Sequence, residues 1–404
     1  MEGNLHVLNK TARSLVNQFL NDFNINKCKI NVTPGTSQGD NYIGLIYKIQ
    51  IETKSSTTCL ILKSAQEEEK FRKLCLIPVL FSRETYIYEK VLFEFDRFQK
   101  DKGIENPFLS YVKYFGSKLD PPNECILMLD MTNLGYKVLD RKDLLNYNHV
   151  ISIVKEYGRF HALSLALFDQ KPSVFEEISK NVETIYSDFD AANMDPILDM
   201  CIAKALQCID PIVDKSIYEK CLRFKEHAFQ VVQKIVRSET SGKYSVVCHC
   251  DAWINNIPFK YSDLTETKNP SELCFIDWQL AQLGSPVLDL TTFLFLSTNK
   301  EFRDIYYDDV IKEYYNSFSG FLKELGSDPE ELFPFSVLQE HLKTFSVFAF
   351  FRVIQALHLL LSDKENIPDF KDTDFDDLGF KENETYNTRM REIMLDFDRL
   401  GYEL

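Results

Sequence analysis

One short segment, HCDAWINN at residues 249–256, concentrates the residue types that phosphate chemistry requires. It has the form H-x-D-x4-N, and a later apolar run, CFID, ends at Asp277. Phosphoryl transfer to a hydroxyl needs a carboxylate beside that hydroxyl and oxygen ligands for the metal that bridges the phosphates. Asp251 could orient the hydroxyl and accept its proton, while Asn256 and Asp277 could hold Mg2+. The segment therefore predicts a site for phosphoryl transfer.

Each of these residues taken alone has a simpler explanation. Asp and Asn are common in tight turns, so a lone H-x-D would favour a turn without a catalytic role. Here the Asp, the Asn and the second Asp occur in order, with β-type segments on both sides. That combination favours the site, because it brings the three side chains to one end of a small β cluster.

The elements that must position these residues change character near residue 130. Before this point, short apolar runs bounded by turn residues predict strands, and two stretches have helical spacing. The predicted strands are at 29–32, 42–51, 59–63, 111–115 and 125–129, and the helices lie before residue 26 and at 80–97. Residues 29–51 form a predicted hairpin across a turn-rich stretch.

Beyond residue 130 the chain has mainly helical periodicity. The predicted helices are at 144–167, 197–237, 300–323, 336–361 and 383–399, with short β segments at 244–250, 256–261 and 273–277. We therefore expect an α+β protein of two lobes, a β-rich N-terminal lobe over residues 1–129 and a mainly helical lobe over residues 130–404.

The site segments also resemble a known family. VVCHCDAWINNIPFKY, followed by CFIDWQLAQLGSPVLDL, is similar to the ecdysteroid kinase-like (CHK kinase-like) family, whose pattern is roughly HGDxWxNNxxFxY, then IDFQ and a later DL. That family falls within the aminoglycoside phosphotransferase and choline kinase superfamily, which has the protein-kinase-like fold. The resemblance covers roughly residues 30 to 360. Cys250 stands where the family usually has Gly, and Trp278 where it often has Phe.

The resemblance implies a bilobal protein-kinase-like fold and an ATP- and Mg2+-dependent kinase that phosphorylates a hydroxyl of a small molecule. The acceptor class that it implies is an ecdysteroid or a hydroxylated xenobiotic. It also implies that His249 and Asp289 support the catalytic loop without reacting, His249 by hydrogen-bonding the backbone that holds the two aspartates. His161 is expected to be a core histidine on a helix.

Lys63 and Glu84 receive roles from the same match. Lys63 ends the apolar strand CLILK and would reach the α- and β-phosphates of ATP, held there by an ion pair with Glu84. A lysine at a strand end is more often a solvated surface residue, and several other glutamates nearby compete with Glu84. The family match favours the Lys63–Glu84 pair.

Two further nucleotide contacts depend on the match more heavily. The loop SQGDNY at 37–42 resembles the GDNY hairpin of the family, in which Gly39 lets the backbone approach the phosphates and Asn41 shares the loop. Leu127 and Leu129 match the hinge that would meet adenine. Gly-Asp-Asn is also ordinary turn chemistry, and the leucines could equally end a buried strand, so both alternatives stay open.

Composition narrows the class of protein. The chain has 404 residues, a formal net charge of -15 and no dense Lys/Arg block, which disfavours a nucleic-acid partner. Its ten cysteines have no regular spacing and its first residues, MEGNLHVLNK, have no apolar signal core, so we expect free thiols and a cytoplasmic protein. The apolar run 345–361 is interrupted by Arg352, which predicts a buried helix and no membrane span. We expect a monomer.

Two other functions compete with a small-molecule kinase. A catalytically inactive family member could serve as a nucleotide-binding or small-molecule-binding protein, and Cys250 is the residue that supports this alternative. A protein kinase is the other alternative, but no DFG…APE segment follows Asp277, so no activation loop is evident.

Overall fold

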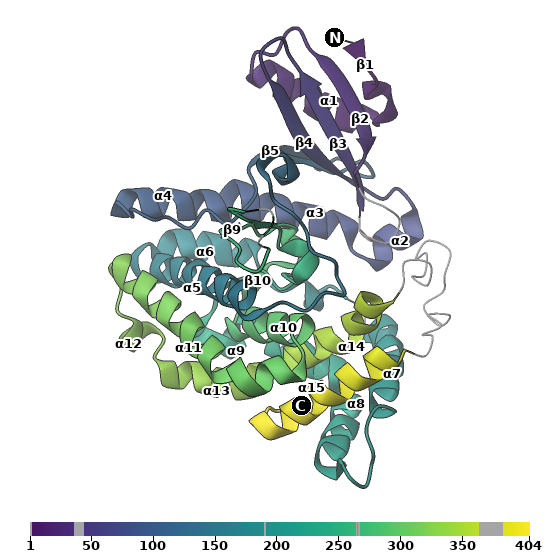
Figure 1. Ribbon diagram of the computed structural model, residues 1–404, viewed down its shortest axis with the longest axis vertical. Coiled ribbons are helices and arrows are strands. Elements are labelled where there is room, and N and C mark those ends of the chain that lie inside the picture. Colours follow the sequence, from purple (N-terminus) through teal and green to yellow (C-terminus); the bar gives the residue numbers. More distant parts are fainter. Residues whose placement is uncertain (1, 36–43, 190, 264, 266, 363–382) are drawn as a thin grey trace.

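The computed structural model describes residues 2–35, 44–189, 191–263, 265, 267–362 and 383–404 (Figure 1). Among these residues, the N-terminal part contains a six-stranded sheet of order β1-β2-β3-β4-β6-β5. Its strands are β1 (Glu2–Gly3), β2 (Lys29–Pro34), β3 (Gly44–Glu52), β4 (Thr57–Ala65), β5 (Tyr114–Lys118) and β6 (Cys125–Leu129). β1 and β2 are parallel, and every other neighbouring pair is antiparallel.

Alternate side chains of β4 face two different environments, a hydrophobic core on one side of the sheet and a cavity on the other. Successive side chains of a strand point to opposite faces. Leu60 and Leu62 are fully buried in a small core that α1 (Lys10–Asp22) covers with its own apolar residues. The residues between and after them, Ile61 and Lys63, face the opposite side, where they line a cavity. The sheet therefore has one structural face and one face directed at the cavity.

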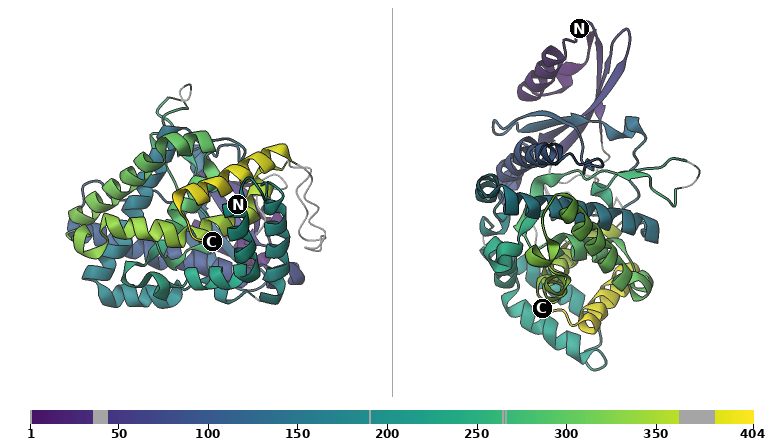
Figure 2. Two further views of the ribbon diagram at one scale, coloured as in Figure 1. Left: turned by 90° about the horizontal axis from the view of Figure 1, so that it is seen from below. Right: turned by 90° about the vertical axis from the view of Figure 1, so that its left-hand side faces the viewer.

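The remainder of the chain is mainly helical. Its helices are α5 (Tyr147–Gln170), α6 (Pro172–Asn181), α7 (Ala191–Leu206), α8 (Lys215–Ile235), α9 (Ser238–Ser241), α10 (Val287–Ser297), α11 (Lys300–Glu324), α12 (Pro329–Leu332), α13 (Phe335–Phe345), α14 (Val347–Leu361) and α15 (Glu384–Leu400). α10 is buried along its whole length. The right-hand view of Figure 2 shows that the sheet occupies one end of the molecule and these helices fill the other.

Three helices of the N-terminal half form a separate group. They are α2 (Glu69–Leu74), α3 (Ile77–Tyr86) and α4 (Leu92–Lys102), and a π-helical turn, Ile87–Val91, joins the last two. Apolar residues of α3 and α4 belong to the large hydrophobic core of the helical part, and α4 packs on α5. Figure 1 shows both helices lying between the sheet and the rest of the molecule. The fold is thus α+β in two lobes, as expected, whereas the boundary at 129/130 stays a prediction.

Two pairs of short strands lie within the helical part. β7 (Val246–Cys248) pairs with β10 (Gln282–Gly284), and β8 (Phe259–Lys260) pairs with β9 (Glu272–Leu273). Both pairings are antiparallel and together they frame the segment 249–256. The segment therefore leaves one small sheet and enters the other.

Several predicted elements need correction. The predicted strand at 111–115 begins later, at Tyr114, and the strand at 273–277 is only the two residues of β9. Tyr111, before β5, and Phe275, after β9, form an isolated β-bridge with each other. The predicted helix at 197–237 is two helices, α7 and α8. Helices α6 and α10 were not predicted; α10 is apolar on every side, which hides the periodicity that identifies a helix.

The apolar run at 345–361 forms α14 with the last residue of α13, and most of α14 is buried. Among the described residues, no single helix is long and apolar enough to cross a membrane. The segments Pro329–Phe345 and Val347–Leu361 together meet that length and composition, but the chain bends by 48° between them.

Candidate active site

A cavity of about 650 Å3 brings together residues from both lobes. Ile46 and Ile61 line it from β3 and β4, and the chain lines it from Met128, near the end of β6, onward. Asp251 and Ile276 contribute from the two segments framed by the short strands. The described residues that line it also include Lys63, Glu84, Trp253, Asn256, Asp277 and Gln279. The cavity thus contains most of the residues that the sequence marks for chemistry.

Lys63 lies at the centre of the charged groups in this cavity. Its Nζ is 2.7 Å from Glu84 Oε2 on α3 and 2.5 Å from Asp277 Oδ1. It also donates to Gln279 Oε1 at 3.2 Å. The predicted Lys63–Glu84 pair is present, and Lys63 is not the solvated surface residue of the alternative interpretation, because its side chain is only 4% exposed.

Burial and charge act in opposite directions on the Lys63 group. Burial favours the neutral amine, but the Asp277 and Glu84 carboxylates outweigh it and hold the pKa of Lys63 above its ordinary value. Burial raises the pKa of Glu84 to about 7, against the opposing effect of the Lys63 ammonium. The Lys63 amine therefore stays positively charged although it is buried.

Asp277 and Asn256 have the donor atoms that Mg2+ prefers. Asp277 has a left-handed backbone, with φ of 67°, which ends the extended chain and starts a short 3-10 turn, Trp278–Leu280. Asn256 is held by its own Nδ2, which donates to the backbone oxygen of Asp251 at 2.8 Å. Both line the cavity and supply hard oxygen ligands, so the donor set fits a magnesium ion.

Asp251 lies in the same cavity and is paired with a different cation. Its Oδ1 accepts from Nη2 of Arg352, on α14, at 2.7 Å, and its side chain is 11% exposed. Burial raises the pKa of Asp251 to about 7, while Arg352 and the Gln279 amide favour the carboxylate. Arg352 therefore offsets part of the cost of burying this charge.

Asp289 supports the backbone that carries Asp251. On α10, its two oxygens accept from the backbone N–H of His249 at 2.7 Å and of Cys250 at 2.6 Å. His161 Nε2 lies 3.1 Å from Asp289, and its Nδ1 is 2.9 Å from the Tyr314 hydroxyl. These contacts confirm that Asp289 braces the loop and that His161 is a satisfied core histidine.

His249 connects the two segments that carry the aspartates. Its Nε2 is 3.0 Å from the backbone oxygen of Ile276, and its Nδ1 accepts from the backbone N–H of Asp251 at 3.3 Å. Its ring is fully buried, and burial lowers its pKa. This confirms the supporting role that the sequence analysis expected.

The comparisons with known proteins agree with this geometry. A match to the ecdysteroid kinase-like family extends over residues 38–327, most of the chain. The chain belongs to the ecdysteroid kinase-like family. Among solved structures it is similar to an ethanolamine kinase of Plasmodium vivax, with 15% identity, a TM-score of 0.41, and coverage of 91% of this chain and 83% of that one. No curated protein matches the sequence. Family membership indicates a small-molecule kinase.

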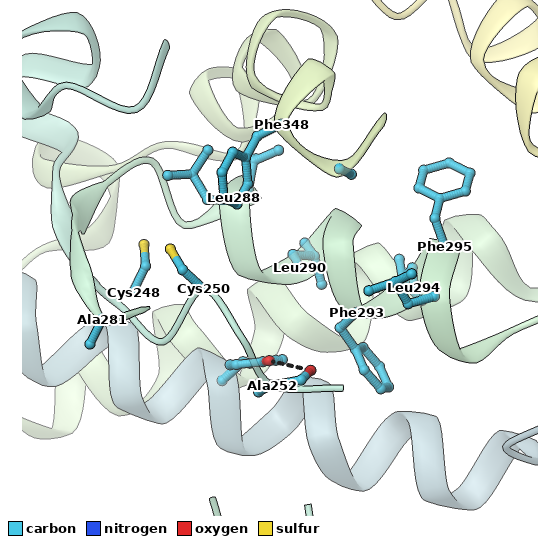
Figure 3. Packing of buried hydrophobic residues seen from close by; sticks show 14 of the residues in the cluster. Cys248, Cys250, Ala252, Ala281, Leu288, Leu290, Phe293, Leu294, Phe295 and Phe348 are labelled. Carbon is cyan, nitrogen blue, oxygen red and sulfur yellow. Dashed lines mark hydrogen bonds between the residues drawn. The ribbon is translucent and has the colours of Figure 1, made fainter. Parts of the chain in front are cut away.

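Cys250, the departure from the ecdysteroid kinase-like pattern, has a left-handed backbone with φ of 61°. Glycine adopts this conformation without strain, which explains why the family usually has Gly there. The Cys250 side chain turns into the core, and Figure 3 shows its sulfur beside that of Cys248, near Leu288 and Phe348. The backbone bond to Asp289 is made despite this side chain. The loop thus has the geometry that places Asp251 in the cavity.

The nucleotide contacts expected from the family pattern have mixed outcomes. Leu129 lines the cavity, as do its neighbours Met128 and Asp130. Leu127 does not; it is fully buried in the small core beneath the sheet, because alternate side chains of β6 face opposite sides. The adenine contact expected at this stretch was with backbone groups, so the contact at Leu127 stays a prediction. Gly39 and Asn41 lie outside the described residues.

Two residues of the site were missed by the sequence analysis. Gln279 lines the cavity, accepts a hydrogen bond from Lys63 and favours the carboxylate form of Asp251. Its only signal was its place in the family pattern IDFQ. Arg352 was noted as an interruption of an apolar run, and a cation in such a run is itself a signal, because a charge is retained in a buried helix only with a partner.

Proposed function

We propose that this protein transfers the γ-phosphoryl group of ATP to a hydroxyl of a small molecule, with Mg2+ as the metal. The observation that carries the proposal is the charge pattern of one cavity. Lys63 forms ion pairs with Glu84 and Asp277. Asp251 lines the same cavity and is paired with Arg352. This pattern provides separate groups for the phosphates, the metal and the acceptor.

Each charged group has a distinct task. Lys63 offsets phosphate charge, and Glu84 keeps its ammonium in place. Asn256 and Asp277 would hold Mg2+, which supplies neutralisation of the phosphate oxygens when bound. Lys63 now bonds Oδ1 of Asp277, and the second oxygen of that carboxylate could serve the metal. Asp251 orients the acceptor hydroxyl and takes its proton as the new P–O bond forms.

The acceptor that we propose is apolar with one or more hydroxyls, such as an ecdysteroid or a hydroxylated xenobiotic. Met131, Val138, Leu139, Trp253 and Pro258 add apolar surface to the cavity. Ligand sites of this kind are mostly apolar, with a few polar groups that fix orientation. Polar residues of the same lining, among them Asp130, Thr132 and Asp140, could fix the orientation of such an acceptor.

The proposal is tested by MgATP binding together with an acceptor screen. Calorimetry should show that Asp277→Ala weakens MgATP binding about tenfold or more without unfolding the protein. Asp199→Ala, which removes an exposed aspartate of α7, is the control and should bind MgATP like the wild type. ATP consumption is then measured against steroids, plant phenolics, glycosides and aminoglycosides. Unchanged MgATP affinity in folded Asp277→Ala would overturn the metal site.

The screen also separates the kinase from an inactive binding protein. The left-handed Cys250 is the observation that favours the second function, because a distorted loop would bind ligands without turnover. Phosphorylation of apolar hydroxyl compounds supports the kinase. Phosphorylation of aminoglycosides alone would refute the acceptor class, and MgATP binding without any turnover would establish the binding protein.

A further inference from the structure

Two buried arginines meet at the carboxyl end of α10, and neither of them lines the cavity. Arg303, near the start of α11, is 1% exposed, and Arg389, on α15, is 8% exposed. Arg303 donates from Nη1 to the backbone oxygen of Thr298 at 2.7 Å, and Arg389 donates from Nη2 to the same oxygen at 3.2 Å. Because they share one acceptor, these two nitrogens are at most about 6 Å apart. Two positive charges therefore lie close together inside the protein.

Capping of the helix explains part of this arrangement. The last carbonyl groups of a helix have no partner within the helix, and cations are favourable beside them. Arg389 also donates to the backbone oxygen of Leu296 at 3.0 Å, so the arginines satisfy the end of α10. The end of a helix, however, carries only about half a negative charge, whereas two guanidinium groups bring two positive charges. Capping alone therefore leaves the charge unbalanced.

The neighbouring carboxylates do not complete the balance. Asp396 is fully buried and accepts from Arg303 Nε at 2.7 Å, but it also accepts from Lys300 and Arg399. Within the described part of the chain, Arg389 bonds backbone oxygens and no carboxylate. The charged side chains of this group are four cations, Lys300, Arg303, Arg389 and Arg399, and three carboxylates, Asp304, Glu392 and Asp396. One positive charge is left over.

The same two arginines have donors that nothing accepts. Arg303 Nη2 and Arg389 Nε are buried and have no hydrogen-bond partner among the described residues. A guanidinium is a rigid planar fork, so these N–H groups lie beside the ones that bond Thr298. Burial and the neighbouring Arg303 charge lower the pKa of Arg389 to about 10, so both side chains stay charged at neutral pH. Buried donors without a partner indicate a bound water or ion.

We propose that a small monovalent anion, of the size of chloride, binds between Arg303 and Arg389. The ion accepts from Arg303 Nη2 and Arg389 Nε, and its charge cancels the positive charge left over in the group. A water molecule would accept from the same N–H groups but would leave two buried like charges uncompensated. The deep burial of both arginines favours a small ion over a phosphate or an organic acid.

The site is linked to the loop that carries Asp251 through a single helix. Asp289, in the first turn of α10, holds the backbone N–H groups of His249 and Cys250. The proposed ion reduces the repulsion between the arginines that bond the last turn of the same helix. Anion binding therefore stabilises the helix on which the loop depends, without contact to nucleotide or acceptor.

Thermal melting at constant ionic strength is the first test, with sodium chloride replacing sodium gluconate, whose anion is too large for a buried site. The melting temperature should rise by at least about 2 °C and then level off, because a site that binds only the folded protein saturates. Sodium bromide should act like chloride. Equal melting temperatures in chloride and gluconate would overturn the site, and a response to sodium phosphate alone would overturn the monovalent class.

A pair of arginine variants locates the effect. Arg389→Gln removes the charge left over and should abolish the chloride-dependent rise. Arg391→Gln changes an arginine two positions further along α15, whose side chain is 44% exposed, and should keep the rise. A full chloride response in folded Arg389→Gln would place the ion elsewhere and contradict the proposal.

Crystals of the wild-type protein soaked in sodium bromide decide the matter if Arg389→Gln does not fold. Bromide replaces chloride and is located by its anomalous scattering. A peak is expected within hydrogen-bond distance of Arg303 Nη2 and Arg389 Nε. Bromide peaks at other positions only, with none between the two arginines, would overturn the site.

Discussion

Two carboxylates at the loop 249–256 are satisfied in different ways. Asp289, on α10, is 1% exposed and accepts from two backbone N–H groups of the loop and from His161. Asp251, a residue of the loop itself, is 11% exposed and is partnered by a guanidinium from a distant helix. The backbone N–H groups bonded to Asp289 are fixed by the fold and cannot leave it. The Arg352 side chain can rotate and leave Asp251, so that this carboxylate can bond a ligand hydroxyl instead. Asp289 therefore fixes the structure of the loop, and Asp251 is available to bind a ligand.

Asp251→Asn should give the largest effect on activity. The amide has nearly the same size but cannot take the acceptor proton, so turnover should fall by about 10^2 to 10^4. MgATP affinity should barely change, because the proposed nucleotide contacts are elsewhere. Kinetics on the best acceptor of the screen, together with calorimetry, measure both quantities. Turnover above about a tenth of wild type would remove Asp251 from the role of base.

Lys63→Met should have the next largest effect on activity. Loss of a cation that faces the phosphates in a site with little water should lower kcat/KM by about 10^2. Lys180→Met, at an exposed lysine of α6, is the matched control. Turnover of the Lys63 variant within about twofold of that control would assign the task to another cation.

Asp289→Asn should lower stability more than Asp251→Asn does, which tests the contrast between the two carboxylates directly. One carboxylate oxygen is replaced by an NH2 group that cannot accept from the backbone of the loop, at a cost of about 2 kcal/mol. Denaturant unfolding of the two variants gives the comparison. If Asp251→Asn proved the more destabilising of the two, the division between structural and functional carboxylates would be wrong.

Cys250→Gly should have the smallest effect. Glycine relieves the strain of the left-handed backbone, about 1 kcal/mol, but removes a buried side chain that contributes a similar amount. The free energy of unfolding should therefore change by less than about 1 kcal/mol, and turnover should stay near wild type. A gain in turnover of about tenfold would show that the thiol restrains the loop in the natural protein.

Local patterns predicted much of this molecule. A short apolar run bounded by turn residues was sufficient to find β6 at its observed bounds, and the order of Asp251, Asn256 and Asp277 was sufficient to place them in one cavity. Contacts between distant segments were not predictable in this way. Nothing near Asp251 in the sequence indicates Arg352, which lies 101 residues away and approaches only because α14 packs against α10.

Other errors have physical causes of the same kind. The side chain of Leu127 lies in the small core and not in the cavity, which a hinge motif does not reveal, because a shift of one residue exchanges the faces of a strand. The predicted strand at 273–277 was too long because, among the described residues, the chain beyond Leu273 pairs only through the isolated bridge between Phe275 and Tyr111. An apolar run in the sequence does not reveal whether a partner strand continues beside it.

Lys63 stands on a strand whose apolar neighbours belong to the small core beneath the sheet, whereas Glu84, Asp277 and Gln279 belong to elements packed on the large core. Any rotation of the sheet about its connections to the helical part therefore draws one ammonium away from three oxygen partners in a single movement. Lys63 thus links the sheet to the helical part through these three contacts. Phosphate oxygens that took the place of its partners would remove all three contacts together, so ligand binding and the position of the sheet relative to the helices would depend on the same side chain.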